Sequence, residues 1–163
     1  QTSASLFDPG YDDKATRLMT DGAKVPSVTS AQAIGQALQH LGAKTIALAT
    51  PYSPEAIQRM GHYFDSKYGV KTVTMIPFNA SNAYEIGLLG PEMARDAFRA
   101  SDISGADVLV VPGGNFPTMP SIAGWEAEFG KPVLTTNQAA LWAVMRIMKM
   151  DEKIPGLGRL LAG

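Results

Sequence analysis

Residues 108–117 read VLVVPGGNFP, and this stretch decides the fold class. Its first four residues are apolar and three of them are β-branched, which predicts a buried strand. The Pro-Gly-Gly-Asn that follows predicts a sharp bend directly after the strand. The sequence therefore predicts a strand that delivers a tight loop to one edge of a sheet.

Strands and helices are predicted to alternate along the rest of the chain. Short strands are expected at Lys44–Ala49, Val70–Pro77 and Pro132–Thr135. Helices are expected between them, since capping or start signals occur at Thr29–Ser30, Ser53–Pro54, Pro91, Ile122 and Asn137. This alternation predicts an α/β fold with a mostly parallel sheet.

Three loops are expected at the carboxyl ends of the strands, where such sheets bind ligands. They are Gln1–Phe7, Thr50–Ser53 and Pro112–Thr118, and a further polar loop, NASNAYE, covers residues 79–85. We therefore expect a ligand among these loops.

The chain also repeats itself. Pro26–Ala33 (PSVTSAQA) aligns with Pro132–Ala139 (PVLTTNQA), and each copy reads as a short strand that runs through paired hydroxyls into a helix. The repeat predicts two related halves with a ligand between them: residues 1–28 plus 133–163, and residues 29–132. Because Gln1 begins what resembles a loop after a strand, the first half is expected to be incomplete. Either residues before Gln1 were removed or another chain completes that half.

Composition excludes several classes of function. The 163 residues carry 14 basic and 15 acidic side chains with no charged run, so no nucleic-acid partner is expected. No apolar run reaches the length of about 20 residues that a membrane helix needs, and the first residues do not resemble a signal peptide. The chain has no cysteine, which excludes thiolate metal sites and favours the cytoplasm. His40 and His62 are predicted on separate helices, so no metal site is expected. No cofactor is expected either.

Four segments together resemble the Asp/Glu racemase superfamily, and within it the maleate cis-trans isomerases and arylmalonate decarboxylases. They are residues 1–5, against a family loop that reads Cys-Thr-Ser, then 25–52, 81–86, and 106–115 together with 132–142. The resemblance implies Rossmann-like (flavodoxin-like) parallel sheets with flanking helices in two halves related by a pseudo-two-fold axis. It also implies that the N-terminal half is incomplete here.

The reactive cysteines of this family have no counterpart in the chain. Aligned by segment, the two cysteine positions fall on Gln1 and Gly113. A thiol ionises near pH 8.5 and is a strong nucleophile, whereas an amide is not basic and glycine has no side chain. The resemblance therefore implies family chemistry without a thiol.

The anion-binding residues of the family, in contrast, do have counterparts. The resemblance implies that hydroxyl, phenol, amide and backbone N–H groups bind a substrate carboxylate, with Tyr52 also a catalytic residue; the residues are Thr2, Ser3, Tyr52, Asn82, Gly113, Gly114 and Asn115. Structural explanations stand beside these roles, since Asn82 and Asn137 are also good helix caps or turn residues. Asp8 is a carboxylate near the first loop, but Asp-Pro-Gly is a turn signature.

These observations predict an isomerase, racemase or decarboxylase (lyase) type of enzyme that acts on a small carboxylic or dicarboxylic acid. It would stabilise an enediolate-like state by hydrogen-bond donors. The alternative is a protein of the same fold that binds a carboxylate without turnover. A flavodoxin-like module, with a phosphate or flavin at residues 113–115, is a third possibility. Residues 154–161 form an apolar tail that would allow a homo-oligomer.

Overall fold

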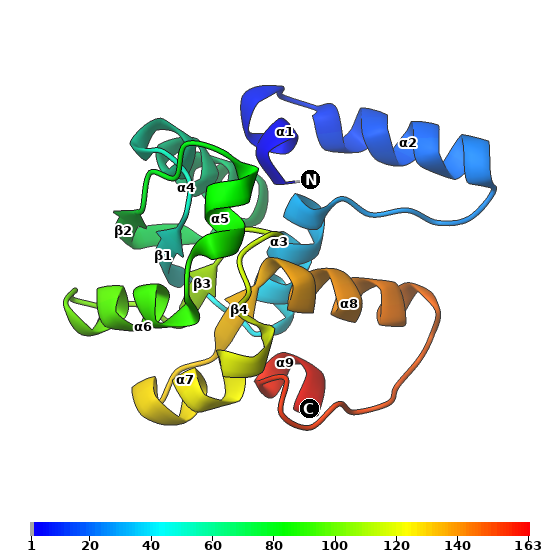
Figure 1. The fold of residues 1–163 in the computed structure, drawn as a ribbon. Coiled ribbons are helices and arrows are strands. Elements are labelled where there is room, and N and C mark those ends of the chain that lie inside the picture. The colour runs from blue at the N-terminus through cyan, green and yellow to red at the C-terminus, as the bar shows by residue number, and fades with distance from the viewer. Residues whose placement is uncertain (1) are drawn as a thin grey trace.

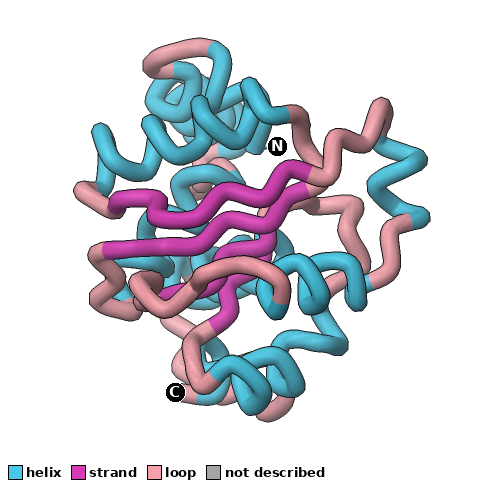
Figure 2. Tube along the Cα trace, turned by 90° about the vertical axis from the view of Figure 1, so that its left-hand side faces the viewer, coloured by secondary structure: helices cyan, strands magenta, loops and turns pink. Residues whose placement is uncertain are grey.

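The computed structural model describes the backbone of residues 2–163 and the side chains from Ser5 onward; Gln1 lies outside the described residues. The described strands form one parallel sheet in the order β2-β1-β3-β4. Their bounds are β1 (Thr45–Thr50), β2 (Lys71–Pro77), β3 (Val108–Val111) and β4 (Val133–Thr135). The predicted α/β class and parallel sheet are confirmed (Figures 1 and 2).

Helices connect and cover these strands (Figure 1). Their bounds are α1 (Thr2–Phe7), α2 (Tyr11–Ala23), α3 (Ser30–His40), α4 (Pro54–Tyr68), α5 (Ala83–Leu88), α6 (Pro91–Arg99), α7 (Ile122–Phe129), α8 (Thr136–Ile147) and α9 (Arg159–Ala162), with a 3₁₀ turn η1 (Met119–Ser121) before α7. In the part of the chain that the structure describes, no helix combines the length and apolar character needed to span a membrane.

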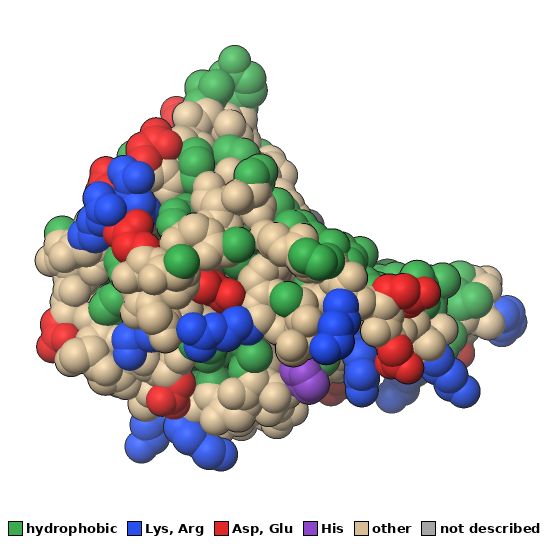
Figure 3. Space-filling model, turned by 90° about the horizontal axis from the view of Figure 1, so that it is seen from below, with side chains coloured by type: hydrophobic (Ala, Val, Ile, Leu, Met, Phe, Trp, Pro, Cys, Tyr) green, Lys and Arg blue, Asp and Glu red, His purple; other side chains and the backbone are tan. Residues whose placement is uncertain are grey.

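Strand β3 is buried on both faces of the sheet, which explains why residues 108–111 are uniformly apolar. Successive side chains of a strand point to opposite faces. Val108 and Val110 accordingly belong to a core formed with α3, α4 and α8, whereas Leu109 and Val111 belong to a core formed with α6 and α7. Side chains of both signs mix on the face drawn in Figure 3, in keeping with the net charge of −1.

The two copies of the repeat end in identical helix caps. The Thr29 hydroxyl accepts the N–H of Gln32, whose side chain in turn accepts the N–H of Thr29; Thr135 and Gln138 do the same for α8. This reciprocal arrangement is a capping box. The prediction that Asn137 caps the last helix is wrong, because the Thr135 hydroxyl occupies that role and Asn137 lies inside the first turn.

The strand predicted in the first copy does not form. Residues 26–29 carry no strand, although Thr29 is extended with φ −85° and ψ 158°. Residues 25–28 line an apolar groove with Met19 of α2 and Val144 of α8 rather than a sheet edge. A strand needs a neighbour that supplies N–H and C=O partners, and the described residues place none there. The division into two halves stays a prediction.

Two segments predicted as loops are short helices. Residues 2–7 form α1, and residues 83–88 form α5 inside the polar segment that follows β2. A six-residue helix completes fewer than two turns, so its sequence shows no clear period. Leu6, which is 7% exposed, attaches α1 to the core, and the Asn82 side chain caps α5. The long helix α2 was not predicted either, and Asp12 is its one buried residue.

The apolar C-terminal tail packs on its own chain. Leu160 and Leu161 of α9 are 5% and 4% exposed, and α9 contacts α8. The buried Glu126 carboxylate fixes this tail because it accepts the N–H of Val133 at 2.9 Å and that of Arg159 at 2.8 Å. These two leucines are therefore not a free surface, and self-association stays a prediction.

The substitution Glu126→Ala is expected to lower the free energy of unfolding by about 2–4 kcal/mol, because two backbone N–H groups lose a charged acceptor. Urea unfolding measures the change. Glu128→Ala is the matched control: its carboxylate pairs with Arg99 at the surface and is expected to cost below about 1 kcal/mol. Equal losses in the two variants would contradict the anchoring role.

Candidate functional site

An open cavity of about 630 Å³ lies where the strands end. Its lining follows each strand in turn: Tyr52 after β1, Asn82 after β2, Gly114 after β3 and Thr136 after β4. Parallel strands place their carboxyl ends at one edge, so these segments meet there. The full lining is Ser30, Tyr52, Ala80, Asn82, Ala83, Ile86, Gly114, Asn115, Thr136 and Asn137. The volume is that of a small-molecule site.

Four of the residues predicted for the site surround this cavity: Tyr52, Asn82, Gly114 and Asn115. The side chains of Thr2 and Ser3 lie outside the described residues, although their backbone forms the first turn of α1 rather than a loop. A ligand-binding role for each of these six residues stays a prediction.

Gly113 lies behind the cavity wall rather than in it. Its N–H donates to the Thr136 hydroxyl at 2.9 Å, so this N–H cannot serve an anion. Its φ is 138°, and a Cβ added here would lie 3.0 Å from Pro51. Glycine is therefore required for the bend itself. The bend can present the N–H groups of Gly114 and Asn115 instead.

Hydrogen bonds fix the polar side chains around the cavity. The Asn137 amide donates to the carbonyl of Gly114 at 3.0 Å, and the Asn115 amide donates to the carbonyl of Ala83 at 3.1 Å. Asn82 Oδ1 accepts the N–H groups of Tyr84 and Glu85, both at 3.0 Å. Asn82 is thus the N-cap of α5, which is the structural role predicted for it beside ligand binding. Its side-chain NH₂ group is the part that can contact a ligand.

Two hydroxyls of the lining, those of Ser30 and Thr136, were not predicted from the sequence. They are the first residues of α3 and α8, directly after the capping threonines. The internal repeat could have revealed them, because it aligns Ser30 with Thr136. A residue that directly follows a helix cap belongs to the helix N-terminus. The N-termini of α3 and α8 therefore both lie at this cavity.

The electrostatics of the cavity favour an anion. Among the described residues that line it, none is Asp, Glu, Lys, Arg or His. The first turns of α3 and α8 contain no acidic residue. Helix N-termini carry partial positive charge and unsatisfied N–H groups, and both stabilise carboxylates. The cavity is thus suited to hold negative charge by dipoles and neutral donors.

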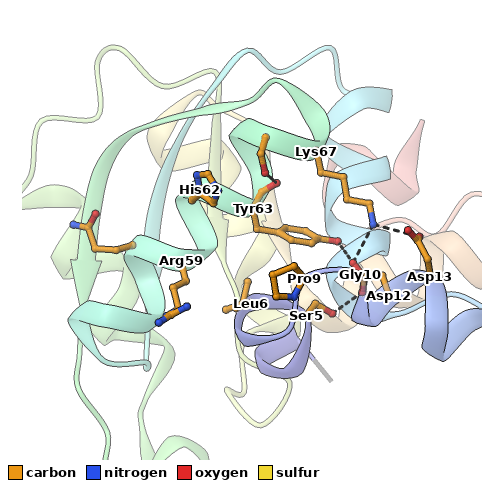
Figure 4. A pocket seen from close by; sticks show the side chains of 12 residues that line it. Ser5, Leu6, Pro9, Gly10, Asp12, Asp13, Arg59, His62, Tyr63 and Lys67 are labelled. Atoms are coloured by element: carbon orange, nitrogen blue, oxygen red, sulfur yellow. Dashed lines mark hydrogen bonds and ion pairs between the residues drawn. The ribbon is translucent and has the colours of Figure 1, made fainter.

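A second polar centre lies behind α1, beside another cavity of about 680 Å³ (Figure 4). The Asp12 carboxylate is 2% exposed. Four donors reach it, from Ser5, Thr29, Tyr63 and Lys67. Burial acts to raise the pKa of Asp12, but these hydrogen bonds outweigh it and hold the pKa below its usual value.

The pKa values of Tyr63 and Lys67, two partners of Asp12, are raised, whereas that of Asp12 is lowered. Burial and then the hydrogen bond to Asp12 raise the pKa of Tyr63. Burial acts to lower the pKa of Lys67, but the nearby carboxylates raise it overall. Near neutral pH this cluster therefore holds an ionised carboxylate, a neutral phenol and an ammonium group.

Comparisons with known proteins identify the family of this chain. A maleate isomerase from Alcaligenes faecalis is 28% identical over 147 residues, which are 88% of this chain and 56% of that protein. One from Nocardia farcinica is 30% identical over 148 residues, 90% and 59% of the two chains. This chain therefore spans somewhat more than half the length of these relatives.

A solved structure also matches the whole fold. It is a cysteine-to-serine mutant of the Nocardia farcinica maleate cis-trans isomerase with a covalently bound succinylcysteine intermediate. Its TM-score is 0.87 at 26% identity, over 96% of this chain and 66% of that one. The family model for arylmalonate decarboxylase matches residues 1–161. The resemblance seen in the sequence is confirmed, and the chain belongs to the arylmalonate decarboxylase family.

Proposed function

We propose that the cavity binds a small carboxylate or dicarboxylate and stabilises an enediolate-like state of it, in an isomerase, racemase or decarboxylase type of reaction. The observation that carries this proposal is the lining of the cavity. Two helix N-termini and neutral donors converge there, and none of the described lining residues is a charged side chain.

Decarboxylation is the reaction to which this lining is best suited. A bound arylmalonate would lose CO₂ when its carbon–carbon bond breaks, and the electron pair would pass into a planar enediolate. Each fixed donor near the developing charge can contribute roughly 3 kcal/mol. A proton from water or from the Tyr52 phenol would then complete the arylacetic acid product.

The absence of cysteine argues against the covalent route. The Nocardia farcinica mutant contains a succinylcysteine intermediate. This chain has no cysteine, so its own residues cannot form such an adduct. An enediolate requires no nucleophile, only stabilisation of charge and a proton source, and the lining can provide both.

Binding without turnover is the second candidate. It is favoured by a specific observation: of the ten lining residues, Tyr52 alone has an ionisable side chain. General acid–base catalysis works best with a group whose pKa lies near the working pH, and none of the ten lining residues has a carboxyl, imidazole or amine side chain. A cavity of this kind can hold a carboxylate without transferring a proton at a useful rate.

Two measurements separate the candidates. A calorimetric titration with phenylmalonate and with maleate tests binding, and NMR spectra over a day in D₂O test conversion. Formation of phenylacetate with one deuterium, unaffected by N-ethylmaleimide, supports turnover. Binding with no new product supports the second candidate, and absence of binding to both probes contradicts the two together. Turnover that N-ethylmaleimide abolishes belongs to a thiol enzyme contaminating the sample.

The substitution Tyr52→Phe is expected to weaken phenylmalonate binding by a factor of about 10 to 100, because a hydrogen bond to a charged group contributes roughly 1.5–3 kcal/mol. Calorimetry measures the dissociation constant. Tyr84→Phe is the control, since Tyr84 is 76% exposed on α5. The affinity of this variant for phenylmalonate is expected to stay unchanged. Equal affinities for Tyr52→Phe and the unsubstituted chain would remove Tyr52 from the site.

A further inference from the structure

The buried Asp12 carboxylate joins three elements that are far apart in the sequence. Figure 4 shows its contacts with Ser5 of α1 and with Tyr63 and Lys67 of α4. Its Oδ1 accepts the Ser5 hydroxyl of α1 at 2.5 Å and the Thr29 hydroxyl at the start of α3 at 2.6 Å. Its Oδ2 accepts the Tyr63 phenol and, at 3.2 Å, the Lys67 ammonium, both from α4. One oxygen thus contacts α4, and the other contacts the two elements that lead toward the predicted ligand.

The contact with Thr29 reaches the cavity through one further residue. The Thr29 hydroxyl gives its proton to Asp12 and accepts the N–H of Gln32 at 3.2 Å with a lone pair. Asp12 therefore orients the hydroxyl that caps α3. Ser30, the next residue, lines the cavity. The orientation of the α3 N-terminus toward a bound ligand thus depends on the Asp12 carboxylate.

Among the described residues, none places such a carboxylate beside the second copy of the repeat. Thr135 forms the same capping box with Gln138, but its hydroxyl faces the Met119 sulfur at 3.9 Å. Sulfur is a weak acceptor. The two caps therefore differ in one respect, the buried charge behind Thr29, and the α8 cap is an internal control.

The contact with Ser5 fixes α1. A helix of six residues is too short to be stable alone, so its position is set by what it contacts. Leu6 packs in the core, and Ser5 adds a directional bond to Asp12. The same helix begins with Thr2 and Ser3, which the family resemblance assigns to the ligand.

We propose that Asp12 is a positioning residue of the carboxylate site. Its carboxylate holds α1 and the N-terminus of α3 in fixed positions relative to α4. It thereby orients the hydrogen-bond donors of these two helices toward the ligand, although Asp12 does not contact the ligand itself. This inference rests on the proposed function. Small displacements of positioned groups weaken an oriented site disproportionately, which gives a residue behind the wall a measurable effect on binding.

The substitution Asp12→Asn disturbs one side of the junction selectively. The Lys67 ammonium has no acceptor capacity, so the new amide must turn its oxygen toward Lys67 and Tyr63. Its NH₂ group then faces Ser5 and Thr29, and their hydroxyls must accept where they previously donated. The Thr29 oxygen, engaged by that amide, is a poorer acceptor for the N–H of Gln32, and the cap of α3 weakens.

Tyr63→Phe is the matched control. It removes a donor to the same carboxylate on the α4 side and leaves the bonds from Ser5 and Thr29 in place. Both variants lose stability, so a purely structural role would affect them alike. A positioning role affects the α3 cap and ligand binding in Asp12→Asn alone.

Two readouts test the inference on the whole chain. Amide exchange by NMR is expected to be about tenfold faster at Gln32 in Asp12→Asn, while Gln138 in the α8 cap changes less than about twofold. The dissociation constant for phenylmalonate is expected to rise about tenfold in Asp12→Asn and less than about threefold in Tyr63→Phe.

The outcomes distinguish this inference from the proposed function. Absence of phenylmalonate binding to the unsubstituted chain overturns the proposed function and this inference with it. Binding by the unsubstituted chain, together with equal binding by Asp12→Asn, overturns the role of Asp12 alone. Equal acceleration of exchange at Gln32 and Gln138 also overturns it, because loss of global stability would then explain the variant.

Discussion

Replacing Asp12 with alanine is expected to lower the free energy of unfolding by about 3–5 kcal/mol, the largest loss of stability we predict for this chain. The substitution leaves Lys67 without its closest carboxylate and leaves the hydroxyls of Ser5 and Thr29 buried without their acceptor. Urea unfolding, followed by circular dichroism, measures the change.

Asp13→Ala is the matched control for this substitution. Asp13 is the next residue and pairs with the same ammonium, at 3.6 Å, but its side chain is 71% exposed. Exposed pairs of this kind contribute at most about 1 kcal/mol. Similar losses in the two variants would show that burial of the Asp12 cluster contributes little.

The substitution Asp12→Ala is also expected to change how the free energy of unfolding depends on pH. The pKa of Asp12 is lowered in the folded state, so its contribution is fully present above the unfolded value of about 3.9 and is lost as the pH falls through the folded value. The charged and titratable groups that face it are Lys67, Tyr63, Tyr68 and Asp13. Below about pH 4 the unfolding free energy of Asp12→Ala should therefore fall less steeply than that of the unsubstituted chain. Parallel curves would contradict this.

The substitution Gly114→Cys is expected to introduce a reactive thiol into the cavity. A Cβ at Gly114 lies 3.7 Å from the Asn137 side chain, an ordinary contact, so the side chain fits. It would lie at the first turn of α8, and a helix N-terminus stabilises a thiolate. The pH midpoint of alkylation by iodoacetamide should therefore fall below about 8.5, with a rate at pH 7 about tenfold above that of an exposed thiol.

Two controls accompany this variant. Tyr84→Cys supplies the exposed thiol, since Tyr84 lies on the open face of α5. Maleate should slow alkylation at position 114 and leave it unchanged at position 84, if the cavity binds carboxylates. Equal pH midpoints for the two thiols would contradict the positive character of the cavity.

Gly113→Cys should behave differently, although the family resemblance assigns a cysteine to this position. Its φ of 138° and the distance of 3.0 Å from an added Cβ to Pro51 predict a loss of about 2–3 kcal/mol. The thiol would face Pro51 and Phe116 rather than the cavity, so slow alkylation is expected. In this chain, Gly114 is thus the position from which a thiol reaches the cavity.

Much of the site could be predicted because it depends on local sequence and on one rule of topology. Apolar runs identified the strands, and the rule that parallel strands end at one edge brought Tyr52, Asn82 and Gly114 together. The repeat predicted matching ends for α3 and α8. Residues 26–29 resemble a strand by the same local criteria, but strand formation also needs a neighbour.

Side-chain burial was harder to predict from period alone. Leu141, Val144, Met145 and Met148 share one face of α8, yet Met145 alone is buried, and the residues that α8 packs inward are mostly small and polar. In α6, Met93 is 41% exposed although it is apolar, while Ala94 and Phe98 are buried. The period gives a face, and the neighbouring elements decide whether it is covered.

By itself the sequence determined the parallel sheet, the bend after β3 and the polar loops at one edge of the sheet, because each depends on neighbouring residues and on chain direction. Only the tertiary structure decided that Asp12 lies buried against the cap of α3. Its donors are 7, 17, 51 and 55 residues away along the chain, and no local pattern relates them. A buried charge is stable only where enough donors converge, and their convergence is a property of the folded chain.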